Sequence, residues 1–147
     1  MASDAREETT GSGYDATHER IYPREYLEGI AHFNAGRYYE AHEIWEDIWL
    51  RSAGGEKRFY HLLIQAAVAL YHEGRSNPHG ARALYERACE KLQKLPPRFM
   101  SLDVTEFGRQ FKAFFAGSFE REIESVASGD RPRPLIRLLR VEVKENE

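Results

Sequence analysis

The chain has 147 residues, of which 41% are hydrophobic, so it is long enough for one domain whose core needs neither disulfide nor metal. The 21 Lys and Arg against 24 Asp and Glu give a net charge of -3, with the basic residues dispersed, which argues against nucleic acid as a partner. A single cysteine, and the lack of an apolar run long enough for a membrane span or a secretory signal, predict a soluble cytoplasmic protein.

The N-terminal residues 1–20 are rich in Thr, Gly, Ser and charge and have no periodic apolar positions, which predicts a disordered arm. A helical bundle domain is predicted over 21–130, because apolar residues recur there at helical spacing between Pro, Gly and Asn signals. The predicted helices cover residues 23–36, 38–51, 56–73, 78–95, 107–115 and, after an interruption at Gly117 and Ser118, 119–127. The remaining 131–147 are expected to form a tail that docks on the bundle through Leu135, Ile136, Leu138 and Leu139.

Local signals mark where two of these helices begin. Asn77 before Pro78 is typical of a helix start, and Asp103 with Glu106 has the spacing of a capping box. No segment shows strand alternation between turn signals. The fold class predicted is therefore all-α, a single-domain antiparallel bundle of about five to six helices joined by short loops.

The ten residues EAHEIWEDIW, 40–49, combine five ionisable side chains with two tryptophans. Helical spacing separates them into three sets. The sets are a core stripe of Ala41, Trp45, Ile48 and Trp49, an outer face of Glu40, Glu43 and Asp47, and a border pair of His42 and Glu46. A second polar stripe, formed by His61, Gln65 and His72, borders the apolar face of the next predicted helix. Only the border residues require an explanation beyond packing or solvation.

Two interpretations of these border residues remain open. If His42 and Glu46 face His61, Gln65 or His72 across an antiparallel contact, they form either a buried hydrogen-bond network or a ligand or metal site. His42, Glu46 and His72 are the candidate ligands, and mixed histidine and carboxylate donors suit zinc, iron or manganese. The spacing His42-Glu43-x-x-Glu46 also matches a zinc-protease helix whose last histidine is replaced by glutamate, with Glu43 as candidate general base.

Two segments of the chain together resemble a known family. FNAGRYYEAHEIWEDIW at 33–49, followed by FYHLLIQAAVALYHEGRSNPHGARALYERACEKL at 59–92, is similar to the DUF309 family of small helical proteins, over roughly residues 24–95. The family pattern falls on Glu40, His42, Glu43, Glu46 and Trp49, and on Gln65, His72, Asn77, Gly80 and Ala81. The resemblance implies an all-α fold and no established reaction.

We therefore expect a helical domain that acts by binding or oligomerisation, with a polar cluster of Glu40, His42, Glu43, Glu46, Trp49, Gln65 and His72 between its second and third predicted helices. The alternative is a metal-dependent hydrolase-like enzyme that uses His42, Glu43 and Glu46 with a divalent metal. A third hypothesis places Trp45 and Trp49 in a homodimer interface. The partner is left as a protein or a small molecule, and neither nucleic acid nor a membrane is expected.

Overall fold

The structure, a computed structural model, describes residues 12–120 and 131–141. Its helices and strands are α1 (Ala16–Ile21), α2 (Arg24–Asn34), α3 (Tyr38–Leu50), α4 (Gly54–Gly74), α5 (Pro78–Gln93), β1 (Arg98–Phe99), β2 (Leu102–Asp103) and α6 (Val104–Glu120). The regular structure of the described part of the chain is thus helical apart from one two-stranded hairpin, which confirms the predicted all-α class. None of these helices is long and apolar enough to cross a bilayer.

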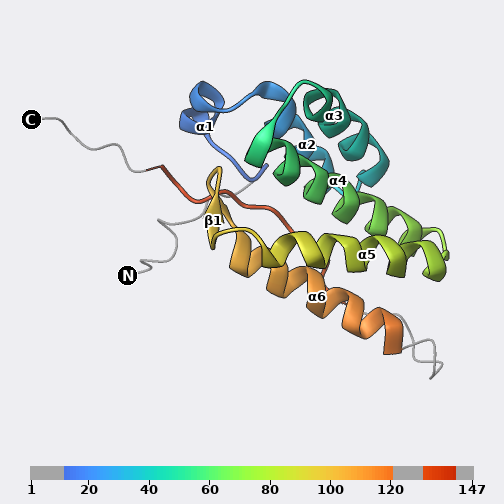
Figure 1. Cartoon of the computed structure of the whole chain (residues 1–147). Coiled ribbons are helices and arrows are strands. Elements are labelled where there is room, and N and C mark those ends of the chain that lie inside the picture. The colour runs from blue at the N-terminus through green and yellow to red at the C-terminus, as the bar shows by residue number, and fades with distance from the viewer. Residues whose placement is uncertain (1–11, 121–130, 142–147) are drawn as a thin grey trace, which may run out of the picture.

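Helices α2 to α5 pack in succession, each against the next, because the loops between them are short. Helix α4 lies between α3 and α5 and forms the centre of the bundle (Figure 1). It is the longest helix among the described residues, with ten of its 21 residues buried, as its broad apolar face predicts. Helix α6 lies beside α5 on the side away from α4 (Figure 1). The central position of α4 means that α3 exposes its outer face to solvent.

The predicted helix starts are confirmed at the atomic level. Asn77 caps α5 by accepting a hydrogen bond from the Gly80 N–H at 3.2 Å, with Pro78 in the first turn. Asp103 caps α6 by accepting from the Glu106 N–H at 3.0 Å. In both helices the cap satisfies a backbone N–H that has no partner within the helix.

Helix α6 does not stop where the sequence predicts an interruption. It continues through Gly117 and Ser118 to Glu120, so the break expected there is wrong, while most of the helix expected over 119–127 lies outside the described residues. The glycine has another use. A Cβ on Gly117 would lie 2.8 Å from Cδ of Arg131, so glycine lets the C-terminal segment approach the helix.

Two elements form where the sequence predicts none. The first is α1 within the expected N-terminal arm, and Asp15 caps it by accepting from the backbone N–H groups of Thr17 and His18. The second is the hairpin, whose turn holds Met100 and Ser101 at positive φ, 48° and 65°. Such turns favour Asn-Gly, which is absent here. Tertiary bonds accompany the turn, since Tyr26 donates to the Met100 carbonyl at 3.0 Å and Tyr22 bonds the Ser101 hydroxyl at 2.7 Å.

Residues 131–141, which we call the C-terminal strap, run extended along α6 and back to the N-terminal segment (Figure 1). Ile136 and Leu138 are 1% and 0% exposed and belong to the same core as the aromatic residues of α2, α4 and α6. The strap therefore adds to the core that the helices form.

Candidate functional site

The core stripe predicted for α3 is present. Ala41 and Trp45 are fully buried and Ile48 nearly so, whereas Trp49 is half-buried at the edge. The Trp45 indole N–H donates to the Tyr26 carbonyl of α2 at 3.2 Å. Since Trp45 is inside the molecule, it cannot contribute to the homodimer interface hypothesised above.

The border pair of α3 is adjacent but loosely joined. The Nε2 of His42 and Oε2 of Glu46 are 3.9 Å apart, with the two side chains 18% and 52% exposed. The Nδ1 of His42 donates to the Tyr39 carbonyl at 2.8 Å, because a carbonyl only accepts. Nε2, the other ring nitrogen, is therefore the one that faces Glu46.

Trp49 and His61 form the contact between α3 and α4 at this edge. Their ring centroids are 5.4 Å apart, and the Lys57 Nζ lies 4.5 Å from the Trp49 ring. Burial and the nearby Lys91 ammonium lower the pKa of His61, because both disfavour the charged imidazole. His61 therefore packs as a neutral ring on the tryptophan at neutral pH.

His72 belongs to the corner between α4 and α5. Its Nδ1 accepts from the Asn77 side-chain amide at 3.1 Å, which leaves the amide oxygen for the α5 cap. A Cβ on Gly80 would lie 3.1 Å from the His72 ring, so glycine gives the imidazole its space. This arrangement gives His72, Asn77 and Gly80 a structural role.

Gln65 lies on α4 and is only 7% exposed. Its Oε1 is buried and has no hydrogen-bond partner in the described part of the chain. No hydrogen bond or ion pair among the described residues joins Gln65 to His42, Glu46 or His72, so the predicted polar cluster is not a hydrogen-bonded network there.

The same residues do not assemble a metal centre. Among residues 12–120 and 131–141, no group of three His, Cys, Asp or Glu side chains lies close enough to hold an ion. His42 and Glu46 come together, whereas His72 is bonded to Asn77. Glu43, the candidate base, is exposed on the outer face of α3.

What the structure does gather is an exposed acidic surface on one helix. Glu40, Glu43, Glu46 and Asp47 are all exposed, and α3 contains no Lys or Arg. Two large apolar side chains, Tyr39 at 48% and Leu50 at 68% exposure, lie on the same side of the helix by its periodicity. We call the six residues Tyr39, Glu40, Glu43, Glu46, Asp47 and Leu50 the α3 acidic face.

The charges of the α3 acidic face are not neutralised by the rest of the described chain. The Arg51 guanidinium, just after α3, pairs with the Glu25 carboxylate of α2 at 2.9 Å and donates to the Asp47 backbone carbonyl at 3.1 Å, but it forms no ion pair with the Asp47 carboxylate. Glu40, Glu43 and Asp47 have no ion pair among the described residues, and the only pairing of Glu46 is the long contact with His42. Like charges three and four residues apart destabilise a helix by a few tenths of a kcal/mol per pair. Solvation makes each exposed carboxylate tolerable, but the fold gains little from the gathering of four of them on one face.

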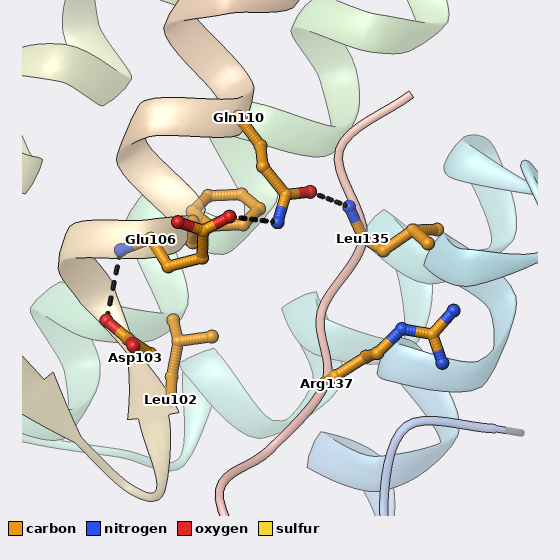
Figure 2. A pocket seen from close by; sticks show the side chains of 7 residues that line it. Leu102, Asp103, Glu106, Gln110, Leu135 and Arg137 are labelled. Carbon is orange, nitrogen blue, oxygen red and sulfur yellow. Dashed lines mark hydrogen bonds between the residues drawn. The ribbon is translucent and has the colours of Figure 1, made fainter. Parts of the chain in front are cut away.

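A cavity of about 150 Å³ lies elsewhere, between α6 and the C-terminal strap. Figure 2 shows Asp103 and Glu106 on one side of it and the strap on the other. Glu106 accepts two hydrogen bonds from Arg109 and one from Gln110, which lowers its pKa to about 2. The residues that line this cavity include none of the predicted cluster, and nothing in the sequence patterns indicated it.

Known proteins are similar to this chain over a segment that includes α3. Residues 26–84 match the family model described as Domain of unknown function (DUF309). The chain is 40% identical over 75 residues to the protein YpuF of Bacillus subtilis (strain 168), a segment that covers 50% of this chain and 43% of YpuF. It is 32% identical over 75 residues to a protein of Aquifex aeolicus (strain VF5), covering 50% of this chain and 22% of that protein.

Both relatives are named as uncharacterized proteins, and the matched segment spans less than half of their length. The resemblance expected over residues 24–95 is confirmed over residues 26–84, which hold most of α2, all of α3 and α4, and the first turns of α5. The comparisons therefore show that residues 26–84 of the chain are similar to the DUF309 domain.

Proposed function

We propose that the chain is a protein-binding domain and that the α3 acidic face docks a basic segment of a partner polypeptide. The observation that carries the proposal is the row of four exposed carboxylates on α3 without a Lys or Arg partner in the described chain. The α3 acidic face adds two exposed apolar side chains, Tyr39 and Leu50, one near each end. Protein interfaces commonly combine such apolar anchors with a charged surround.

The charge of the surface determines the class of partner. Negative potential attracts Lys and Arg and repels phosphate, so the α3 acidic face favours a basic protein segment and disfavours nucleic acid. The partner's apolar side chains would cover Tyr39 and Leu50, which are otherwise exposed to water. The single cysteine of the chain fits a reducing compartment, and we propose that the partner is met in the cytoplasm.

A binding experiment with a matched charge control tests this proposal. The probe is a fluorescent helical peptide with lysines and leucines on one face, titrated into the full chain. Glu43→Lys with Asp47→Lys is expected to weaken binding at least tenfold, because two attractions become repulsions. The control, Glu86→Lys with Glu90→Lys, makes the same change of net charge on exposed positions of α5 and should weaken binding less than threefold.

A separate variant tests the apolar part of the α3 acidic face. Leu50→Ser removes an anchor that is 68% exposed, so the fold should be retained while affinity for the same peptide falls severalfold. Equal weakening by the α3 and α5 charge variants would show a general charge effect and would refute a specific site. Absence of any measurable binding to the peptide would count against the proposal equally.

A further inference from the structure

The backbone of the C-terminal strap is bonded along much of its length, in addition to the contacts of its side chains. Six of its backbone groups, in four residues, are bonded by groups that belong to other parts of the chain. Two strap N–H groups donate to side chains: Leu135 to Gln110 Oε1 (3.0 Å) and Ile136 to Asn34 Oδ1 (2.8 Å). Two more donate to backbone carbonyls: Leu138 to Gly13 (2.8 Å) and Leu139 to Ser101 (2.8 Å). The Leu139 carbonyl accepts from His18 Nε2 (2.9 Å). A sixth bond runs from Asn34 Nδ2 to the Ile136 carbonyl (2.8 Å).

Asn34 forms a clamp on a single residue of the strap. Its amide oxygen accepts from the Ile136 N–H and its amide nitrogen donates to the Ile136 carbonyl, both at 2.8 Å. An Asn side chain that bonds both backbone groups of one extended residue reproduces the pairing of a neighbouring strand. Because it contacts only backbone atoms, the clamp would hold any residue with a free N–H at that position.

Gln110 of α6 holds the strap at Leu135, as Figure 2 shows. Its Nε2 donates to Glu106, so its Oε1 is directed to the Leu135 N–H. Leu135 and Leu139 point their N–H groups to α6 and the hairpin turn, while Ile136 and Leu138 point theirs to Asn34 and Gly13. Both edges of an extended segment are therefore recognised, as in β-strand addition.

Alternate side chains of the strap supply the apolar part of the contact. Pro134, Ile136 and Leu138 are buried, whereas the intervening residues Leu135 and Arg137 are only half-buried. The period of two is that of a strand with one face on a core. The seat that receives it is thus defined by apolar subsites at three alternate positions and by backbone clamps between them.

We propose that this seat, which we call the strap groove and define by Gly13, His18, Asn34, Ser101 and Gln110, is a binding site for an extended segment of a partner protein. The chain's own strap occupies the groove as a resident competitor. The partner segment would carry apolar side chains at three alternate positions and free backbone N–H groups at the positions equivalent to Leu135, Ile136, Leu138 and Leu139. This inference is independent of the α3 acidic face, which lies on another helix.

The cavity beside the strap favours exchange. A cavity of about 150 Å³ lies between the strap, at Leu135 and Arg137, and the hairpin and α6. The strap is therefore incompletely packed against these elements. Filling a void recovers dispersion contacts that the resident segment does not make. A partner segment with a larger side chain at this position would gain contacts relative to the strap, which helps it to overcome the intramolecular advantage of the resident.

The first experiment follows amide hydrogen exchange in the full chain with an excess of a peptide of sequence RPRPLIRLLRV, residues 131–141. Displacement of the resident strap should accelerate exchange at Leu135, Ile136, Leu138 and Leu139 at least tenfold, because these amides lose their acceptors during each opening. A peptide with the same composition and scrambled order controls for its basic charge. No acceleration at saturating peptide, or equal acceleration by both peptides, would overturn the proposal.

The second experiment weakens the resident strap and tests the clamp directly. Ile136→Ser with Leu138→Ser in the full chain should increase affinity for the labelled peptide at least tenfold, and adding Asn34→Ala should abolish that gain. Gln93→Ala, at an exposed position on α5, is the matched control for the third change. A peptide N-methylated at the position of Ile136 should also fail to bind, since it lacks the N–H that Asn34 accepts. Equal binding of the methylated peptide would contradict recognition by the clamp.

Discussion

At the scale of single residues, Gly29 and Trp45 set the distance between α2 and α3. A Cβ on Gly29 would lie 2.0 Å from the Trp45 Nε1, which is too short for any two carbon or nitrogen atoms that are not bonded to each other. The indole is fully buried and its N–H is held by Tyr26, so it has no free space into which to move. This contact positions the outer face of α3, although neither residue touches solvent there.

Gly29→Ala should therefore destabilise the protein strongly, by about 3 kcal/mol, because the helices must separate or Trp45 must leave its place. Urea unfolding followed by tryptophan fluorescence measures the change. Gly74→Ala is the matched control, since a Cβ there meets nothing within 4 Å, and it should change stability little. A loss below about 0.5 kcal/mol for Gly29→Ala would show that the α2–α3 contact is not as close as described.

Residues with local roles could be predicted, and those with distant partners could not. The core stripe of α3 follows from helical periodicity, and the Asn77 cap follows from its place before Pro78. Asn34 looks like an ordinary helix-terminal residue, because its partner Ile136 is 102 residues away. Gln65 and His72 were predicted to form a cluster with α3, yet His72 bonds within its own corner.

At the scale of elements, the start of α6 depends on a network around Glu106. Arg109 donates two hydrogen bonds to this carboxylate, at 3.0 and 2.8 Å, and Gln110 a third at 2.9 Å. These bonds favour the ionised form and lower the pKa of Glu106 to about 2. Because Gln110 also holds the strap, the network links the first turns of α6 to the C-terminal strap.

A depressed pKa gives stability that is present above the unfolded-state pKa of glutamate, about 4.3, and lost as the pH falls through about 2. Glu106→Gln should therefore lower the free energy of unfolding at pH 7, by up to about 1 kcal/mol, since the carboxylate is partly exposed. The difference from the unsubstituted chain should vanish near pH 2. Thermal unfolding between pH 2 and pH 7 measures this difference in stability, with Glu86→Gln on the exposed side of α5 as the control. A difference that stays constant at every pH would refute the assignment to Glu106 ionisation.

The elements themselves were predictable to different degrees. Helices α2 to α5 carry long periodic apolar patterns, and their positions agree with those predicted within a few residues. Helix α1 has only six residues and its buried side chain is a histidine, so no apolar period marks it. The hairpin turn at Met100 and Ser101 lacks the usual turn residues, and contacts from Tyr22 and Tyr26 accompany it.

At the scale of the whole molecule, His18 joins the N-terminal segment to the strap. Its Nδ1 accepts from the Asp15 N–H at 3.0 Å and its Nε2 donates to the Leu139 carbonyl at 2.9 Å, while the ring itself is fully buried. The imidazole thus uses both nitrogens, one as acceptor and one as donor, and couples α1 to a segment more than 100 residues later.

His18→Ala should lower the free energy of unfolding by about 2 to 4 kcal/mol, because it leaves a cavity and two backbone groups without partners. Amide exchange should rise together at α1 and at Leu138 and Leu139, whereas amides of α4 keep their relative protection. His79→Ala, at an exposed position in α5, serves as the control. Faster exchange confined to α1 would show that the two segments are not coupled.

The N-terminal segment and the C-terminal strap meet through a backbone hydrogen bond. The Leu138 N–H bonds the Gly13 carbonyl at 2.8 Å, so these two segments lie side by side although they are far apart in the sequence. The fold is therefore expected to tolerate a circular permutation in which a short linker joins these two segments. For the same reason it would sit as an insert in a loop of a host protein without forcing the host's flanking segments apart.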